Sequence, residues 1–401
     1  MEGLRTTGGV LRQAWTVAGA YAAQAFGYAA VVTSLPALRT SAGLDDTGLS
    51  LVLLGMTFAA ASGSLLANLI AVRAGSRSAL LLGLGAQATG LASAALSGAA
   101  APLIASLVVM ATGLGLVDAG ANMQGSLTER RAGRPVFGRL YAAGTLAGIL
   151  ATLLTVVALS VGAAAMAVLL VASGVHLAAA LAGWRGFDRQ RAAHRVDDVP
   201  RARARLPYRA MVLVGLLVFA AFVIDTAVAS WGTIYATDIL GLPAALAPVG
   251  YACYLVAVFA ARLATDPLVR RLGRLPVGIA ATVTGLLGAT LLTLGWPLPA
   301  ALAGFGLAGL AFGALVPLAF GRAGELLPER SDEVIARVNM FNYAASVLGA
   351  VLPGIVAELT SLNWAYLLLA GSLAACLPAL AVLRPPSPAA ATAGQGGATA
   401  G

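Results

Sequence analysis

Twelve long apolar stretches follow one another along the chain, and they limit the folds open to it more than any other feature. A helix needs about 20 residues to cross about 30 Å of hydrocarbon. Lipid offers no partner to an unpaired backbone amide, so segments that span it must be helical. The sequence therefore predicts an all-α integral membrane protein with twelve transmembrane helices, at residues 13–37, 48–72, 79–97, 101–125, 137–160, 163–183, 210–234, 246–265, 276–296, 298–320, 334–357 and 361–383.

The composition excludes a soluble protein. Hydrophobic residues make up 59% of the 401 residues and charged residues only 10%, whereas a soluble domain carries about 25% charged residues. All 25 basic residues are arginines, so the lysine of an ATPase phosphate loop is missing. The two cysteines, Cys253 and Cys376, lie in apolar stretches and form neither a disulfide framework nor a zinc spacing. We expect no metal, no cofactor and no nucleic acid.

The arginines predict the orientation in the membrane. If the N-terminus is cytoplasmic, the inner connections carry every arginine cluster and Arg39 alone falls on the outer side. The reverse orientation would break the positive-inside rule at almost every loop. We expect both termini in the cytoplasm and a multi-pass protein in the cell membrane.

One long polar connection divides the chain. We predict an N-terminal six-helix half at 1–183, a cytoplasmic linker at 184–209 and a C-terminal six-helix half at 210–383. The tail at 384–401 is rich in proline, alanine and glycine, and we expect it to be disordered.

A short loop occurs twice, once in each half. "NLIAVRAGSR" after the second stretch aligns with "DPLVRRLGRL" after the eighth, so that Arg73 and Gly75 fall on Arg271 and Gly273. The repeat predicts two pseudo-symmetric halves. Such halves are typical of transporters, whose solute site lies between them near the membrane midplane.

The repeated loop resembles the signature loop of the major facilitator superfamily, Gly-x-Leu-Ala-Asp-Arg-x-Gly-Arg-Lys. The arginine and glycine match in both copies, while Val72 and Arg270 replace the motif aspartate. The resemblance implies a monomeric transporter that moves a small-molecule solute across the bilayer by alternating access, with protons as the coupling ion.

Three further stretches favour a narrower subgroup. "GLVDAGANMQGSLTERRAGRP", "ASWGTIYATDILG" and "GALVPLAFGRAGE" resemble bacterial proteins related to sugar permeases such as the fucose–proton symporters. "AAGTLAGIL" in the fifth stretch lacks the glycine-proline motif of many drug exporters. The alternative is efflux of a drug or secondary metabolite by proton antiport, with the direction of transport unassigned.

A polytopic membrane enzyme is a remote alternative, because the two histidines form no catalytic cluster. A channel or sensor would need a pore motif or a receptor domain, and the sequence has neither.

Acids inside the spans mark the candidate site. Asp118 and Asp225 lie well inside a span, one in each half, and a charge at the bilayer centre costs at least about 2.5–3.5 kcal/mol. Asn122, four residues after Asp118, shares its helical face. We predict that these residues couple protons or bind a cationic or hydroxylated solute; the alternative for Asp118 is a structural hydrogen bond from its protonated form.

Other polar and aromatic residues complete the prediction. The resemblance places Gln24, Asn339 and Asn342 on cavity-lining helices. Trp231 and Tyr235, four residues apart, form either an aromatic wall of the site or part of the interfacial aromatic belt. For the cytoplasmic gate, Arg262 and Asp266 form either a latch or an arginine that reaches the interface. The gate and signature loop together comprise Arg73, Gly75, Arg262, Asp266, Arg271 and Gly273.

Overall fold

The computed structural model describes residues 2–132, 137–162, 164–188, 206–295, 297–327 and 331–384. All regular structure in these ranges is helical. The predicted linker beyond Asp188 and the predicted disordered tail beyond Arg384 lie outside the described residues. The helices are α1 (Glu2–Ala42), α2 (Asp46–Ala74), α3 (Ser76–Ala95), α4 (Ala100–Ala132), α5 (Phe137–Ser160), α6 (Ala165–Gly186), α7 (Tyr208–Asp238), α8 (Val249–Leu272), α9 (Arg274–Thr293), α10 (Leu298–Leu326), α11 (Ser331–Leu359), α12 (Leu362–Ala365), α13 (Leu367–Cys376) and the 3₁₀ helix η2 (Leu377–Leu383).

Within the described ranges, 11 helical segments are long and apolar enough to cross a membrane. The segment 362–383 counts as one of them. The predicted all-helical membrane protein is thereby confirmed, with segment boundaries close to those expected from the apolar stretches.

Helix α1 is not among the 11, although its 41 residues make it the longest helix in the described chain. It packs against α4, α5, α6 and α7, and small residues such as Ala20, Ala23 and Ala30 are fully buried in these contacts. A helix surrounded by other helices needs less apolar surface than one that faces lipid. Its central place therefore permits its modest hydropathy but does not require it, since the most buried span, α7, is also the most apolar.

The last predicted span is broken rather than continuous. The stretch expected as one helix at 361–383 forms α12, α13 and η2 in succession. Pro378 stands at the start of the 3₁₀ segment, and proline lacks the N–H that an α-helix would use there. Proline thus changes the helix type in this segment.

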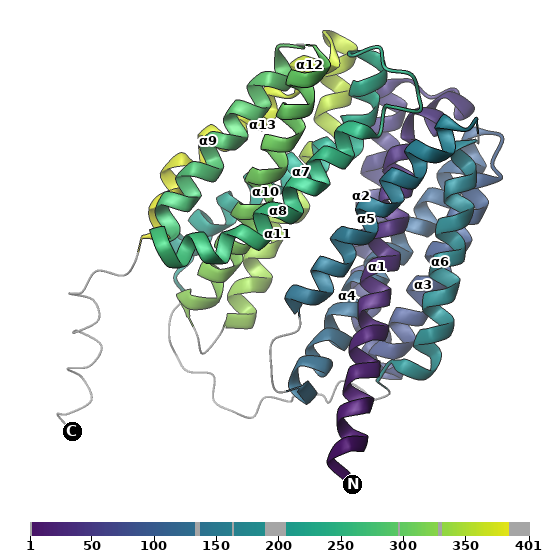
Figure 1. Cartoon of the computed structure of the whole chain (residues 1–401), viewed down its shortest axis with the longest axis vertical. Coiled ribbons are helices and arrows are strands. Elements are labelled where there is room, and N and C mark those ends of the chain that lie inside the picture. Colours follow the sequence, from purple (N-terminus) through teal and green to yellow (C-terminus); the bar gives the residue numbers. More distant parts are fainter. Residues whose placement is uncertain are drawn as a thin grey trace.

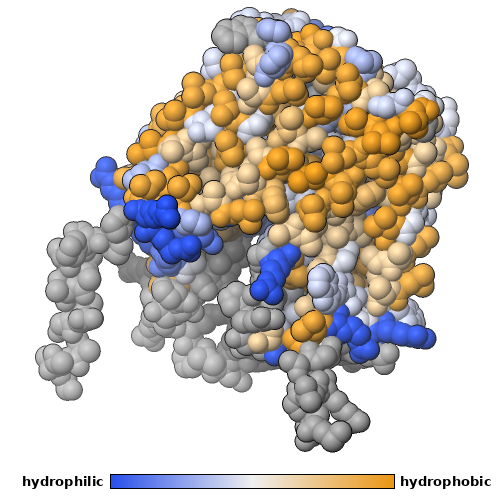
Figure 2. All heavy atoms as spheres, in the orientation of Figure 1, coloured by the Kyte–Doolittle hydropathy of each residue, from blue (hydrophilic) through white to orange (hydrophobic). Residues whose placement is uncertain are grey.

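The helices pack in two groups. Helices α1 to α6 contact mainly one another, and α7 to η2 do the same; α1–α7, α2–α11 and α5–α8 are the main contacts between the groups. Figure 1 shows the two groups meeting at one end and diverging toward the end where the N-terminus lies. In Figure 2 an apolar surface covers the visible face of both groups, and hydrophilic residues gather toward the N-terminal end.

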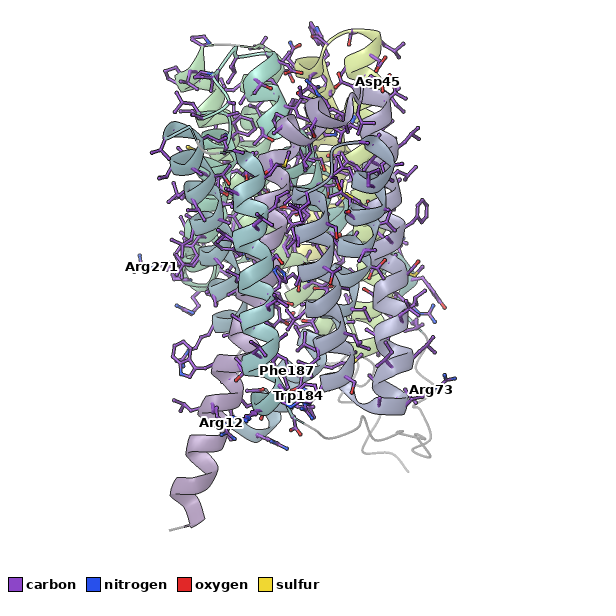
Figure 3. The ribbon with its side chains drawn as sticks, turned by 90° about the vertical axis from the view of Figure 1, so that its right-hand side faces the viewer. Arg12, Asp45, Arg73, Trp184, Phe187 and Arg271 are labelled. Carbon is purple, nitrogen blue, oxygen red and sulfur yellow. The ribbon has the colours of Figure 1, made fainter. Side chains whose placement is uncertain are left out.

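The two ends of the bundle differ in charge. Arg12, Arg73 and Trp184 lie at one end and Asp45 at the other (Figure 3). We call the first the arginine-rich end and the second the Asp45 end.

The repeated loop has the same backbone conformation in both copies. Gly75 separates α2 from α3 with φ 89° and ψ 153°, and Gly273 separates α8 from α9 with φ 86° and ψ 164°. Side chains on L-residues disfavour positive φ, so glycine is required at both turns. The structure therefore explains why the glycine of this motif occurs in both copies.

Close helix contacts repeat at the same spacing. A Cβ on Gly115 of α4 would lie 1.8 Å from the Ala60 carbonyl oxygen of α2, and one on Gly313 of α10 would lie 2.7 Å from that of Val258 in α8. The sequence distance from Gly115 to Gly313 equals that from Gly75 to Gly273. Small residues let the backbones approach in both pairs of helices.

Substitution of either turn glycine should destabilise the protein. In Gly75→Ala or Gly273→Ala, the new side chain meets a backbone conformation that costs on the order of 1–3 kcal/mol. We expect a lower thermal unfolding midpoint for each variant in detergent. Gly85→Ala is the control, because a Cβ there meets nothing within 4 Å; an equal loss in the control would contradict the conformational explanation.

Candidate functional site

Asp118 is solvent-exposed although it lies near the middle of the 33-residue helix α4. Gln24 of α1 hydrogen-bonds to its carboxylate. One turn further along α4, Asn122 Oδ1 accepts hydrogen bonds from the hydroxyls of Tyr21 on α1, at 2.5 Å, and Tyr141 on α5, at 3.2 Å. The face of α4 that carries Asp118 therefore points between α1 and α5, away from lipid.

Asp225 occupies a comparable place in the second group. It lies in the middle of α7, and Tyr254 of α8 donates a hydrogen bond to its Oδ1 at 2.8 Å. Tyr28 of α1 and Tyr251 of α8 interact with it electrostatically. Because Tyr28 belongs to the first group, Asp225 lies close to the boundary between the groups.

Arg262 connects these two sets of residues. Its Nη1 donates to Thr145 Oγ1 on α5 at 2.8 Å, and its guanidinium lies 5.9 Å from the ring centre of Phe312 on α10. It also interacts electrostatically with Tyr141 and with Asp225. One continuous set of polar residues thus crosses from α4 to α7. We call it the central polar cluster: Tyr21, Gln24, Tyr28, Asp118, Asn122, Tyr141, Thr145, Asp225, Tyr251, Tyr254 and Arg262.

The two predicted asparagines of α11 lie beside this cluster. Both are half-buried. Asn342 Oδ1 accepts from Ser346 Oγ at 3.2 Å, and Thr226, next to Asp225, donates to the same Ser346 hydroxyl at 3.4 Å. Asn342 is therefore linked to α7 one residue from the acid, whereas no described contact ties Asn339 to the cluster.

Trp231 and Tyr235 pack among helices in the described conformation and do not line the central polar cluster. Trp231 and Tyr235 are both fully buried. Trp231 Nε1 donates to the Ala350 carbonyl of α11 at 2.9 Å, and the Tyr235 hydroxyl donates to that of Leu292 in α9 at 2.7 Å. Neither residue lies on the cluster or in an interfacial belt, because both rings fill space between helices of the second group.

The predicted latch between Arg262 and Asp266 does not form among the described residues. Asp266 is exposed at the arginine-rich end of α8, while Arg262 turns toward α5 and Phe312. Arg73 and Arg271 are exposed at their loops, and Figure 3 shows both pointing outward. The signature-loop arginines thus lie apart from the central polar cluster.

Gln124 has a structural role at the arginine-rich end. Its amide group donates to Ser76 Oγ at 3.0 Å and to the Asp188 carbonyl at 2.9 Å, and its Oε1 accepts from the Asp188 N–H at 2.9 Å. Arg131 forms an ion pair with the Asp188 carboxylate. The beginning of the predicted linker is thereby held against α4, in the region labelled by Trp184 and Phe187 in Figure 3.

Polar contacts join the two helix groups at the Asp45 end. Arg39 of α1 binds Asp46 of α2 at 2.6 Å and Asp238 of α7 at 2.7 Å. The backbone N–H of Thr47 donates to Glu358 of α11 at 3.1 Å. Together with the diverging ribbons at the other end, these contacts describe a bundle closed at its Asp45 end.

Sequence reasoning missed the tyrosines of the cluster. Tyr21, Gln24 and Tyr28 are spaced three and four residues apart on α1, and Tyr251 and Tyr254 are three apart on α8. These spacings put the members of each set on one helical face. A search for polar aromatic residues at helical spacing inside apolar spans would have found them.

Membrane-length helices around a polar cluster are typical of a multi-pass membrane protein. The described residues contain no group of three metal-ligand side chains. The model of the Major Facilitator Superfamily matches residues 17–298 and 219–401. The chain therefore belongs to the major facilitator superfamily and is a membrane transporter.

Similar proteins agree with this assignment. The chain is 29% identical over 271 residues to the uncharacterized transporter y4wD of Sinorhizobium fredii, covering 67% of this chain and 70% of that protein. It is 25% identical over 350 residues to an uncharacterized MFS-type transporter of Yersinia pestis, covering 85% and 88%. Among solved structures, the D323A mutant of the nucleoside transporter NupG has a TM-score of 0.76 at 15% identity, covering 93% of this chain and 100% of that chain.

Trp231 should prove to be a packing residue. Trp231→Ala removes a fully buried indole, and such truncations cost about 3–5 kcal/mol. Trp231→Phe removes mainly the hydrogen bond to Ala350, worth about 1 kcal/mol. We expect the thermal unfolding midpoint to fall from the wild type to Trp231→Phe and further to Trp231→Ala. A Trp231→Ala variant as stable as the wild type would contradict this role.

Proposed function

We propose that the protein is a proton-coupled transporter that moves a small hydroxylated organic solute by alternating access, with the central polar cluster as the site for solute and proton. The observation that carries the proposal is the exposed carboxylate of Asp118 in mid-membrane, between α1 and α5. A charge there is expensive unless it serves binding or proton transfer. Asp225 supplies a second carboxylate in the other helix group.

We take α1–α6 and α7–η2 as the two halves that move against each other. The positive-inside rule supports an arginine-rich end in the cytoplasm, with both termini there and the halves joined by the linker 184–209. In that orientation the contacts of Arg39 and Thr47 close the outer side, and the described conformation is open to the cytoplasm. Transport then requires these contacts to break as the inner ends approach.

Three considerations support a hydroxylated solute. The cluster offers amide and phenol groups at Gln24, Asn122 and several tyrosines, which suit hydroxyl groups. The sequence resembles the fucose permease subgroup, and the fold resembles a nucleoside transporter. Two acids against one arginine in the cluster disfavour an anionic solute.

Alternating access predicts opposite distance changes at the two ends. Spin labels at Arg73 and Arg271 report on the arginine-rich end, and labels at Thr40 and Ala244, both exposed, report on the other. Cys253 and Cys376 are first replaced by alanine. In pulsed electron resonance we expect a population with a shorter inner distance and a longer outer distance.

A variant that removes the ion pairs of Arg39 at the Asp45 end serves as the control for the distance measurements. Arg39→Ala removes the guanidinium between Asp46 and Asp238 and should enlarge the population with the longer outer distance. Single, unchanged distances at both ends, in the wild type and in Arg39→Ala alike, would contradict alternating access.

Proton coupling predicts that the conformational equilibrium depends on Asp118. Between pH 5.5 and 8.5 the label distances of the wild type should redistribute, because protonation removes a charge from the cluster. Asp118→Asn resembles the protonated acid and should hold one distribution across this range. Asp266→Asn, which changes an exposed acid outside the cluster, should keep the wild-type response. A pH response preserved in Asp118→Asn would refute coupling through this residue.

A further inference from the structure

We propose that Asp118 and Gln24, beside the hydroxyls of Tyr21 and Tyr141, recognise a protonated amino group, so that the solute is a hydroxylated organic cation. This inference rests on the proposed transport function and narrows its substrate class. These groups have unused hydrogen-bonding capacity, and no arginine among the described residues pairs with Asp118.

The Asp118 carboxylate has unused acceptor capacity. Its two oxygens can accept about four hydrogen bonds, and within the described chain Gln24 is its one donor. The hydroxyls of Tyr21 and Tyr141 donate to Asn122 instead. Gln24 Oε1 is itself buried without a partner in the described structure. The Asp118 carboxylate and Gln24 Oε1 are therefore two hydrogen-bond acceptors with few donors between them. An ammonium group supplies three N–H donors.

Among the described residues, no arginine forms an ion pair with Asp118. The ion pairs of Arg39, Arg131, Arg274 and Arg322 all involve other acids. The cluster's guanidinium, Arg262, bonds Thr145 and interacts with Asp225. A carboxylate inside a span faces water, pairs with another group or takes up a proton. The solute can supply the cation.

The surroundings suit an organic cation. The rings of Tyr21 and Tyr141 pack edge to face with centres 5.3 Å apart, and both interact electrostatically with Asp118. The tyrosine hydroxyls therefore place polar groups beside the carboxylate, from α1 and from α5. The Asn122 carbonyl is occupied by both hydroxyls, which leaves its N–H groups to bind a solute hydroxyl.

Asp118 and Asp225, the two acids of the cluster, then have different roles in binding. Asp225 accepts a hydrogen bond from Tyr254 and lies near Arg262, so donors and positive charge are already present. Asp118 faces Gln24 and Tyr21 from α1 and Tyr141 from α5, none of them cationic. A proton and an ammonium group therefore compete for Asp118, and the binding of one releases the other.

Matched pairs of small solutes test the inference on the purified full-length protein. Glucosamine against glucose and 2-amino-1,3-propanediol against glycerol each differ by one amino group. At pH 7 we expect the two amines to raise the thermal unfolding midpoint at millimolar concentration and the two neutral partners to leave it unchanged. Lowering the pH to 5 should weaken amine binding as protons occupy Asp118.

Variants connect the effect to the residue. Asp118→Asn should weaken amine binding by about thirtyfold or more, since it removes the carboxylate that pairs with the ammonium group. Asp118→Glu should retain binding, and Asp266→Asn should bind as the wild type does. The elution volume and unfolding midpoint of each variant without solute check its folding.

The inference is overturned if the amine and the neutral solute of each pair bind equally, or if neither pair shifts the thermal unfolding midpoint. It is also overturned if Asp118→Asn binds amines as the wild type does. Its failure remains distinct from failure of the proposed function. Opposite distance changes at the two ends of the bundle would still support alternating access of a neutral solute, whereas static distances would count against transport itself.

Discussion

The cost of an unpaired polar group in hydrocarbon governs this structure at two levels. For the backbone, it requires helices wherever the chain crosses lipid. For side chains, it requires that each polar group inside a span find a partner or face water. The central polar cluster meets that requirement in most places: Tyr254 satisfies Asp225, two tyrosines satisfy Asn122, and Thr145 binds Arg262. Asp118 meets it by exposure, with Gln24 beside its carboxylate.

Small residues let the helices come close enough to enclose such a cluster. Gly115 and Gly313 remove the side chains that would separate α2 from α4 and α8 from α10. The tight packing leaves α1 and α7 among their neighbours rather than in lipid. Polar side chains on α1, among them Tyr21, Gln24 and Tyr28, can therefore be directed at protein.

The described conformation joins the two helix groups through few polar contacts. Arg39 holds Asp46 and Asp238 at the Asp45 end, while Arg262 reaches Thr145 near the cluster. Surface ion pairs contribute little stability, about 0–1 kcal/mol each. Contacts of this strength are compatible with the proposed alternating access, in which the two helix groups separate at one end without unfolding.

The sequence by itself determined the class of fold, the boundaries of most helices, the glycine turns at Gly75 and Gly273, and the acids Asp118 and Asp225 as candidates. These follow from local rules: span length, backbone conformation and the cost of charge in lipid. Tertiary structure alone decided that Trp231 and Tyr235 are packing residues, that Arg262 turns to Thr145 rather than Asp266, and that Gln124 holds the chain at Asp188. Helical spacing tells which residues share a face but not which neighbour that face meets, because the rotation of each helix is set by packing against the others.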